Sequence, residues 1–540
     1  MRKKHKRSLP LIVCGVLILT LFAGCGDAET ASHMNNSSNS VKSGEKTVTV
    51  AISGKNGVAT MDPTYMMTDI LHYELVYDPL VIYGENGKIE PGLAESWDIS
   101  DDGKEYTFHL RKDVKFSDGS DFNADNVIFN TDRWKNNPNT ASINVCNSLQ
   151  TVTKIDDNTV KFTFDKAYYP FLTELTYSGP CRMMSKNSVD AGGKFIKPIG
   201  TGMWMIKSSQ EDKETVLVPN PNYWGEKPKF DKLVIKVIPD AQTRLMALQS
   251  GEIDFCCVPI PTESFPAIEK DSKLELASNK STKGYHIIFN YDVPAFQNLQ
   301  IRQAINYAID KDSIVNDILD GNAGAAKGVL ATTNAYVNDK NSPGYKYDPD
   351  KAKNLLTEAG CIDSDGDGIL EYNGEPMSFK FVFQTDEYPE WKDVCEYISN
   401  ELKAIGIEFK LELQPSTEYY DSLWTNRSFD VIMYRIYLDS WNPHGFLSGQ
   451  YCKDTAGSPR VAWDSDELDA MITKVLQEMD ESSRQQQYDE IFRYLYDNAV
   501  NIPIYYPNVS YAYNKEKLSN FQFAVTEYEL IKWGRLEVKG

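Results

Sequence analysis

Hydrophobic and polar residues follow two patterns along this chain, and together the patterns predict a mixed α/β fold. Apolar residues alternate with polar ones, or form short runs, in the segments that we predict to be strands. These segments are 47–52, 106–110, 159–164, 233–238, 283–290, 407–413, 429–434, 502–506 and 510–513. Apolar residues recur at helical spacing in the segments that we predict to be helices. These are 68–76, 124–134, 240–251, 297–309, 348–360, 390–404, 466–479 and 482–498.

Residues that begin and end helices support two of these predictions. Asp240 precedes an apolar helical pattern that stops at Gly251, as an N-cap and a C-terminal glycine would. Asp348 and Pro349 supply an N-cap and a first-turn proline, and Gly360 ends that helix. Both helices alternate with predicted strands, as expected of an α/β protein.

The N-terminus reads as an export signal. Basic residues come first, and the apolar run 11–22 that follows is too short to span a bilayer stably. Small residues then precede Cys25, as in a lipoprotein signal, so we expect 1–24 to be removed and Cys25 to carry a lipid. A plain signal peptide is the alternative. Residues 25–46, rich in Ser, Asn and Gly, read as a flexible tether.

Composition excludes some classes of function. A chain of 540 residues is too long for one core, and 41% hydrophobic residues with 12% aromatics describe a folded globular protein. The formal net charge is −21, which argues against nucleic acid as a partner. The nine cysteines show no C-x-x-C spacing, so they indicate neither a disulfide framework nor a zinc knuckle. We expect Cys256 and Cys257, neighbours in a strand, to pack in the core.

Several longer blocks recur in an order that identifies a family. The segment 197–244 contains a Gly-Thr-Gly turn, a Tyr-Trp-Gly bend, a strand and the helix capped by Asp240. Earlier blocks are Y-D-P-L at 77–80, P-G-L-A-E-S-W at 91–97 and V-K-F-S-D-G at 114–119. The chain thereby resembles the family 5 extracellular solute-binding proteins, which deliver oligopeptides, dipeptides or nickel chelates to ABC importers. Residues 167–172 and 223–228 look most like the nickel branch.

The resemblance implies an architecture and a function. The fold would be a two-lobed periplasmic-binding-protein-like fold with an extra subdomain on the first lobe (cluster C type). Lobe I would cover 47–289, lobe II 290–508, and 509–540 would return to lobe I, so that two crossings form a hinge. The receptor would be a monomer and would not be an enzyme. It would hand a nickel or related metal chelate to ABC permease subunits with a cytoplasmic ATPase. It would lie outside the cytoplasm, anchored by a lipid to the bacterial cell membrane.

Two alternatives stay open. The cargo could instead be a dipeptide or oligopeptide, or the fold could serve a surface sensor or adhesion protein. An enzyme is not indicated, because the chain has no H-E-x-x-H, no G-x-S-x-G and no P-loop. The Gly-Thr-Gly turn also lacks the spacing of a dinucleotide-binding motif. We therefore expect no resident cofactor.

Ligand contacts are predicted in two places. Four aromatics cluster with charged residues after the strand 429–434, where open α/β sheets place binding loops. By resemblance Tyr437 and Trp441 match cleft-lining aromatics of the nickel branch, whereas Asp439 matches the carboxylate that binds a peptide ammonium in peptide-binding members. Arg182 matches an arginine that grips a chelate carboxylate, a task that suits the fork of a guanidinium. A surface arginine is the plainer interpretation.

Histidines and an aspartate run are the candidate metal ligands. His444 and His72 lie in segments that resemble cleft-lining ones, and a neutral imidazole suits nickel. The nickel branch's own metal-binding histidine would fall near Thr455 and is absent, so the chelator would otherwise supply every ligand. Asp363, Asp365 and Asp367 resemble the start of a calcium loop with Glu371 at its ninth position. Gly374 stands at the twelfth position, which favours a tight turn over a calcium site.

Overall fold

The computed structural model describes residues 44–54, 61–65, 71–134, 137–140, 144–436, 443–453, 463, 465–525 and 529–539. The chain divides into two units, Met1–Gly44 and Glu45–Gly540. The predicted signal, Cys25 and most of the tether lie outside the described residues. Among the helices described, none is both long and apolar enough to span a membrane.

Twelve strands of the described residues form one mixed sheet. The strand order is β18-β17-β19-β13-β20-β11-β1-β10-β9-β8, and β12 and β14 also pair with β20. The strands are β1 (Thr47–Ile52), β8 (Trp204–Gln210), β9 (Glu214–Pro219), β10 (Lys232–Val237), β11 (Phe255–Cys256), β12 (Leu274–Lys280), β13 (Tyr285–Phe289), β14 (Ala323–Ala325), β17 (Ser378–Phe383), β18 (Glu408–Leu413), β19 (Val431–Arg435) and β20 (Asn501–Asn514).

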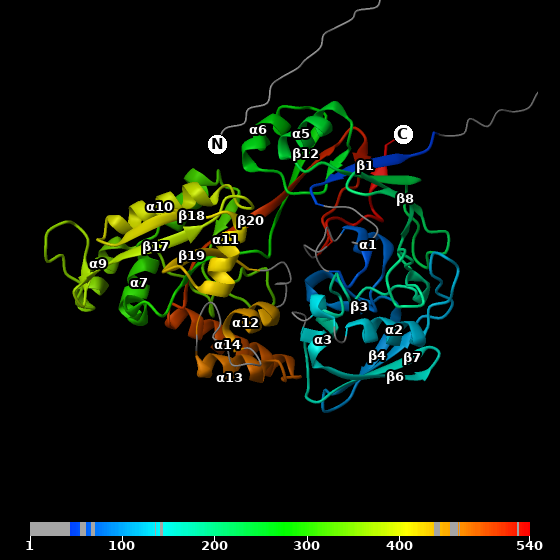
Figure 1. Ribbon diagram of the computed structural model, residues 1–540, viewed down its shortest axis with the longest axis horizontal. Helices are drawn as coiled ribbons and strands as arrows, with labels where there is room; N and C mark the ends of the chain where they lie inside the picture. The colour runs from blue at the N-terminus through cyan, green and yellow to red at the C-terminus, as the bar shows by residue number, and fades with distance from the viewer. Residues whose placement is uncertain are drawn as a thin grey trace, which may run out of the picture. The chain divides into compact units, whose positions relative to one another are not determined.

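The long strand β20 lies in the middle of this sheet and joins its two halves (Figure 1). It pairs with β13 near Asn501 and with β12 from Asn508 to Asn514. The sequence predicted two strands here, at 502–506 and 510–513, and this was wrong, because one strand runs through. Pro507 breaks the apolar pattern, but a proline removes a single N–H donor and its neighbours still pair with β12 and β14.

Separate hydrophobic cores define two lobes and a subdomain. The core of lobe II draws all its buried members from residues 285–505. In lobe I, one core draws its members from 48–77, 184–257 and 509–536, and a second lies around α5 and α6. The lobe boundaries predicted at 290 and 508 stay predictions, because the residues of a core do not show at which residue a lobe begins.

Helices cover both parts of the sheet. Helix α10 lies on β17 and β18, whereas α5 and α6 lie near β11 and β12 (Figure 1). The helices are α1 (Leu71–Val76), α2 (Ala124–Trp134), α3 (Asn144–Ser148), α4 (Phe171–Glu174), α5 (Ala241–Ser250), α6 (Phe265–Glu269), α7 (Leu299–Tyr307), α8 (Lys311–Ser313), α9 (Pro349–Glu358), α10 (Trp391–Lys403), α11 (Ser416–Asp421), α12 (Pro443–Tyr451), α13 (Asp466–Val475) and α14 (Glu481–Asp497).

A second, four-stranded antiparallel sheet forms the extra subdomain. Its order is β4-β5-β7-β6, built from β4 (Ala94–Ile99), β5 (Glu105–Leu110), β6 (Leu149–Asp156) and β7 (Thr159–Phe164). Phe171 of α4 packs edge-on against Phe108 and Phe164, with centroids 5.9 and 4.8 Å away. The short strands elsewhere are β2 (Val81–Tyr83), β3 (Ile89–Pro91), β15 (Glu371–Tyr372), β16 (Glu375–Pro376), β21 (Leu518–Ser519) and β22 (Glu537–Val538).

Local signals in the sequence are found where they were predicted. The Asp240 side chain accepts the N–H of Thr243, and Gly251 ends α5 with a φ of 78°. Asp348 accepts the N–H of Lys351 at the start of α9. Cys256 and Cys257 are buried, as expected of core residues.

Candidate functional site

The blocks that carry the family resemblance meet around one half-buried carboxylate, Asp78. Its Oδ2 accepts a hydrogen bond of 2.9 Å from the Thr201 hydroxyl and one of 2.8 Å from Trp224 Nε1. Burial raises the pKa of the Asp78 carboxyl, and the two hydrogen bonds act in the opposite direction. Three segments distant in sequence are therefore joined through a single side chain in lobe I.

The Gly-Thr-Gly turn can reach this junction because its glycines lack Cβ atoms. A Cβ on Gly200 would lie 1.9 Å from the carbonyl oxygen of Val76, and one on Gly202 would lie 2.5 Å from the carbonyl carbon of Val76. The N–H of Gly202 donates to the same Val76 oxygen. The turn thus lies directly on the C-terminal end of α1, which fixes Asp78 two residues further on.

Arg182 lies beside this junction and is buried, with 3% of its surface exposed. Its Nη2 is 2.8 Å from Glu529 Oε1 and 3.3 Å from the Ser178 hydroxyl, and Nη1 donates to the Tyr77 carbonyl oxygen at 3.3 Å. The surface interpretation of Arg182 is wrong, because backbone pairing with Pro79 places it inside lobe I. The guanidinium holds a carboxylate there, but that carboxylate belongs to the chain itself.

The partner carboxylate comes from the C-terminal segment, which folds back on α1. Trp533 Nε1 donates to Glu74 Oε1 at 2.9 Å, and the indole packs 6.2 Å from the ring of Phe255. Burial, and then the negative charge of Glu529, hold the pKa of the Glu74 carboxyl well above its ordinary value. Sequence reasoning missed Glu74 and Glu529. Neither has a motif, and Glu529 is 347 residues from Arg182.

His444 belongs to a contact between the lobes. It lies on α12 of lobe II with 4% of its surface exposed, and its Nε2 is 2.9 Å from Glu174 Oε1 on α4. The Tyr168 hydroxyl donates to the same carboxylate oxygen at 2.6 Å. The second predicted metal ligand, His72, is buried on α1 in lobe I. Among the described residues neither histidine belongs to a group of three potential metal ligands, so their coordination of a metal stays a prediction.

Tyr169 forms the centre of a second contact between the lobes. Its N–H donates to the Leu476 carbonyl oxygen at 3.1 Å, and its hydroxyl forms a hydrogen bond with the hydroxyl of Tyr488. The guanidinium carbon of Arg484 lies 4.3 Å from the centre of the Tyr169 ring. A segment that resembles the nickel branch therefore contacts α14 of lobe II.

The predicted ligand loop leads to α12, which carries His444. Tyr437, Asp439 and Trp441 lie outside the described residues, and their roles stay predictions. The structure describes the ends of their segment: β19 ends at Arg435, and α12 begins at Pro443. The loop thus connects a strand of lobe II to the helix that carries His444.

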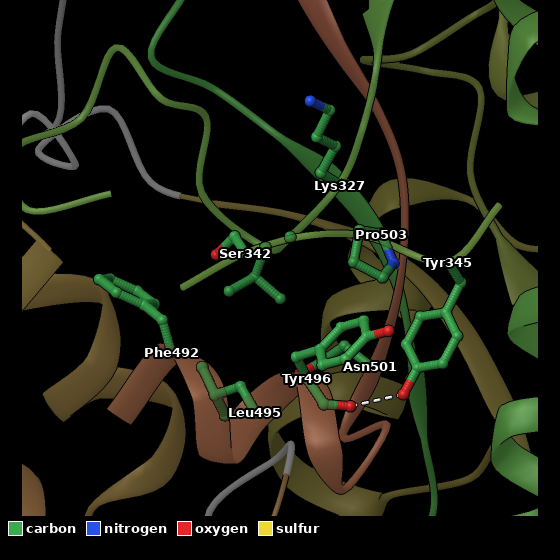
Figure 2. A pocket seen from close by; sticks show the side chains of 10 residues that line it. Lys327, Ser342, Tyr345, Phe492, Leu495, Tyr496, Asn501 and Pro503 are labelled. Atoms are coloured by element: carbon green, nitrogen blue, oxygen red, sulfur yellow. Dashed lines mark hydrogen bonds between the residues drawn. The ribbon is translucent and has the colours of Figure 1, made fainter. Parts of the chain in front are cut away.

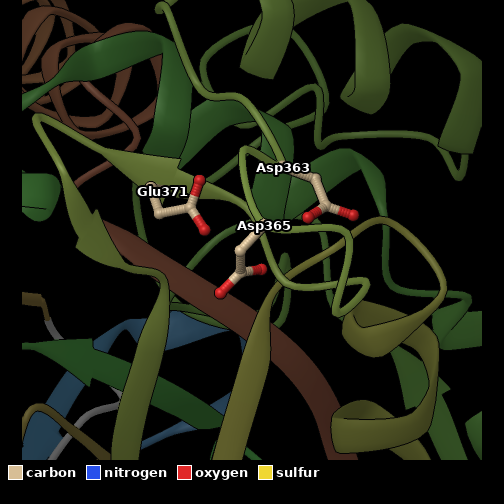
Figure 3. A group of neighbouring side chains, drawn as sticks. All are labelled: Asp363, Asp365 and Glu371. Carbon is tan, nitrogen blue, oxygen red and sulfur yellow. The ribbon is translucent and has the colours of Figure 1, made fainter.

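The aspartate run forms an exposed turn with three neighbouring carboxylates (Figure 3). Oxygens of Asp363, Asp365 and Glu371 lie within 4.8 Å of one another, whereas Asp367 accepts the N–H of Ile369. Backbone amides already donate to these groups, among them a bond of 2.7 Å to Asp363 and one of 2.8 Å to Glu371. The arrangement satisfies the carboxylates as a turn does, and calcium binding stays a prediction.

A small cavity in lobe II is separate from all these groups. It lies between α14 and the segment 327–345, with Phe492, Tyr496 and Ser342 in its wall (Figure 2). Its volume of about 20 Å³ accommodates about one water molecule, far less than the roughly 300 Å³ or more of typical ligand pockets. It cannot receive a chelate or a peptide.

Comparison with known proteins adds a family. Residues 88–458 match the model of the bacterial extracellular solute-binding proteins, family 5 Middle. The nickel-binding periplasmic protein of Escherichia coli is 32% identical over 477 residues, which cover 86% of this chain and 90% of that protein. The dipeptide-binding protein of Escherichia coli is 28% identical over 456 residues, covering 79% of this chain and 83% of that protein.

The fold has close counterparts among solved structures. The crystal structure of NikA from Brucella suis in complex with Fe(III)-EDTA superposes with a TM-score of 0.82 at 28% sequence identity. The match covers 91% of this chain and 100% of that one. The two-lobed α/β architecture predicted from the sequence is thereby confirmed.

Proposed function

Because the chain belongs to the bacterial extracellular solute-binding proteins of family 5, we propose that its cargo is a nickel or related metal chelate that bears a carboxylate. Members of this family bind small ligands or peptides outside the cytoplasm for ABC permeases with ATPase subunits, and they are not enzymes. The cargo would be captured between the lobes and passed to the permease. The identity of the cargo is the part that we propose.

The observation that carries this proposal is the Arg182 guanidinium. It is a buried cation beside the junction of the family blocks, and it binds a carboxylate oxygen at 2.8 Å. A chelate carboxylate could take the same position, because a guanidinium recognises any planar carboxylate through the same fork. The similarity to a nickel-binding protein and to a protein that holds Fe(III)-EDTA supports a chelate as the cargo.

The rest of the proposed site follows from the sequence prediction. Tyr437 and Trp441 would cover the organic part of the chelate and exclude water from the ion pair, which strengthens it. The chelator would supply the metal ligands, since the His444 imidazole is occupied by Glu174 in this structure. His444 would become a ligand only if its contact with Glu174 opened, whereas His72, on α1 of lobe I, stays a predicted ligand.

Calorimetry on the mature chain tests the cargo. We expect heat of binding with nickel plus free histidine or with a nickel polycarboxylate, and a loss of affinity of about 30-fold or more in Arg182→Gln. Arg302→Gln is the matched control: Arg302 is also 3% exposed, but it donates to backbone carbonyls of lobe II. The control variant should lose thermal stability and keep its affinity.

A dipeptide or oligopeptide is the second candidate cargo. Asp439 favours it, because a carboxylate would attract a peptide ammonium and repel a carboxylate-rich chelate. The similarity to a dipeptide-binding protein supports the same candidate. If dipeptides bind, lose affinity in Asp439→Ala, and nickel chelates give no heat, the chelate proposal is wrong.

We also propose that Cys25 anchors a monomeric protein to the outer face of the cell membrane by a lipid. Mass spectrometry should find the mature chain beginning at a lipid-modified Cys25. Cys25→Ala should release the protein from membranes, whereas Cys14→Ala, within the segment expected to be removed, should not. An unmodified Cys25, or cleavage at another position, would contradict the proposal.

A further inference from the structure

We propose that Glu529 is an internal substitute for the cargo's carboxylate: it occupies Arg182 in the empty protein and is exchanged for the carboxylate of the cargo. This rests on the proposed function, in which the cargo brings a carboxylate to Arg182. Glu529 would thereby select cargo by charge, because a cargo without a carboxylate could not take its place. It is a specificity-determining residue in this sense.

The two sides of the Arg182–Glu529 pair differ in freedom. The side chain of Arg182 is 4% exposed and that of Glu529 is 38% exposed. A buried guanidinium cannot leave, since its charge would lack a partner in a medium of low dielectric constant. The carboxylate can turn toward water, where it is well solvated. An exchange in which Arg182 stays and Glu529 leaves therefore costs less free energy than one in which Arg182 moves.

The neighbouring carboxylates cannot perform this role, because other groups hold them. Asp78 is fixed by Thr201 and Trp224, and Glu74 is fixed by Trp533 and by the backbone of Leu530. Within the described part of the chain, the hydrogen bond that holds the Glu529 carboxylate comes from Arg182 alone. Glu529 is thus the one carboxylate of this group whose release breaks a single contact.

The chain on the C-terminal side of Glu529 is anchored independently of the pair. Ile531 forms a backbone bridge with Phe523, and Trp533 is held by Glu74 and packs on Phe255. Release of Glu529 can therefore occur by rotation of its side chain, without loss of packing in the core of lobe I. The segment keeps the carboxylate ready to return when the cargo leaves.

The charges leave room for one carboxylate next to Arg182. The negative charge of Glu529 already contributes to the raised pKa of the Glu74 carboxyl, so carboxylates in this group repel one another. A cargo carboxylate that arrived without the release of Glu529 would add to this repulsion. Exchange of one carboxylate for another keeps the local charge unchanged. Binding of a cargo carboxylate without release of Glu529 would add a negative charge.

Calorimetry on Glu529→Gln tests the exchange with two probes. Nickel–histidine carries a carboxylate, whereas nickel–histamine keeps the imidazole and the amine but lacks it. Removal of the internal competitor should raise the affinity for nickel–histidine about fivefold, the size expected of one partly exposed ion pair. The affinity for nickel–histamine should not change. In the Arg182→Gln background, Glu529→Gln should have no effect on either probe.

Glu537→Gln is the matched control. Glu537 lies in the same C-terminal segment, and its side chain is also 38% exposed. It pairs with a lysine, Lys229, at 2.7 Å and does not contact Arg182. This variant should bind both probes as the wild type does. If Glu529→Gln does not fold, Glu529→Asp shortens the side chain by one methylene and should raise the affinity in the same direction.

The outcomes separate this proposal from the proposed cargo. Unchanged or lowered affinity for nickel–histidine in Glu529→Gln, or an equal gain for both probes, overturns the exchange. If nickel chelates bind no variant, the chelate proposal fails, and dipeptides with a free or an amidated C-terminus take their place. The exchange then requires that Glu529→Gln raise the affinity for the dipeptide with a free C-terminus and leave the affinity for the amidated one unchanged. If no probe with a carboxylate binds, the exchange is overturned.

Discussion

Acid should destabilise lobe II through His286, a buried histidine on β13. Its ring packs between Tyr434 and Phe446, with centroids 5.8 and 5.9 Å away, and 1% of its surface is exposed. Neither ring nitrogen has a hydrogen-bond partner among the described protein atoms. Burial lowers the pKa of His286 from 6.5 to about 3, because the charged imidazolium has no compensation there.

The sign and size of the effect follow from linkage. The unfolded chain binds the proton near pH 6.5 and the folded chain does not, so stability is complete above pH 6.5 and falls as the pH drops toward 3. Each pKa unit corresponds to about 1.4 kcal/mol, so His286 should cost about 2.5 kcal/mol between pH 7 and pH 4.5. The full shift would cost about 5 kcal/mol near pH 3, an upper limit.

Substitution His286→Leu removes the titration and keeps a similar volume. In urea denaturation, the free energy of unfolding of the variant relative to the wild type should rise by about 2.5 kcal/mol between pH 7 and pH 4.5. His109→Leu is the control, because it removes a histidine that is partly exposed and paired with Asp98. A pH-independent difference for His286→Leu, or an imidazole of His286 that titrates near 6.5 by NMR, would refute the reasoning.

Three further predictions address other parts of the structure. Burial lowers the pKa of Lys311 to about 7, so Lys311→Met should raise the free energy of unfolding at pH 7 by on the order of 4 kcal/mol, and this gain should shrink toward pH 10 in urea titrations. Gly200→Ala should lower the melting temperature strongly or prevent folding, because its Cβ would lie 1.9 Å from a carbonyl oxygen. Gly449→Ala, with no atom within 4 Å of its Cβ, should be neutral or stabilising by calorimetry. Tyr169→Ala should increase the radius of gyration in small-angle scattering with cargo present, because it removes the hydrogen bond to Tyr488; an unchanged radius would show that this contact does not hold the lobes together.

Much of the fold could be predicted from the sequence because its signals are local. The caps of α5 and α9 depend on side chains within three residues of the helix start, and the sequence shows them directly. Pairing between strands is different, since it depends on which segments meet. The sequence therefore missed the continuity of β20, whose pattern breaks at Pro507 while its pairing with β12 and β14 continues.

The candidate site divides in the same way. The sequence by itself singled out Arg182 and the blocks around Asp78, because a family motif consists of residues that are neighbours in the sequence. The tertiary structure alone decided that Arg182 is buried and that Glu529, 347 residues away, is its partner. It also decided that His444 of lobe II meets Glu174 of lobe I. The partner of a charged side chain depends on which chain segments fold together, and the strength of the ion pair depends on how deeply it is buried. Neither can be read from neighbouring residues in the sequence.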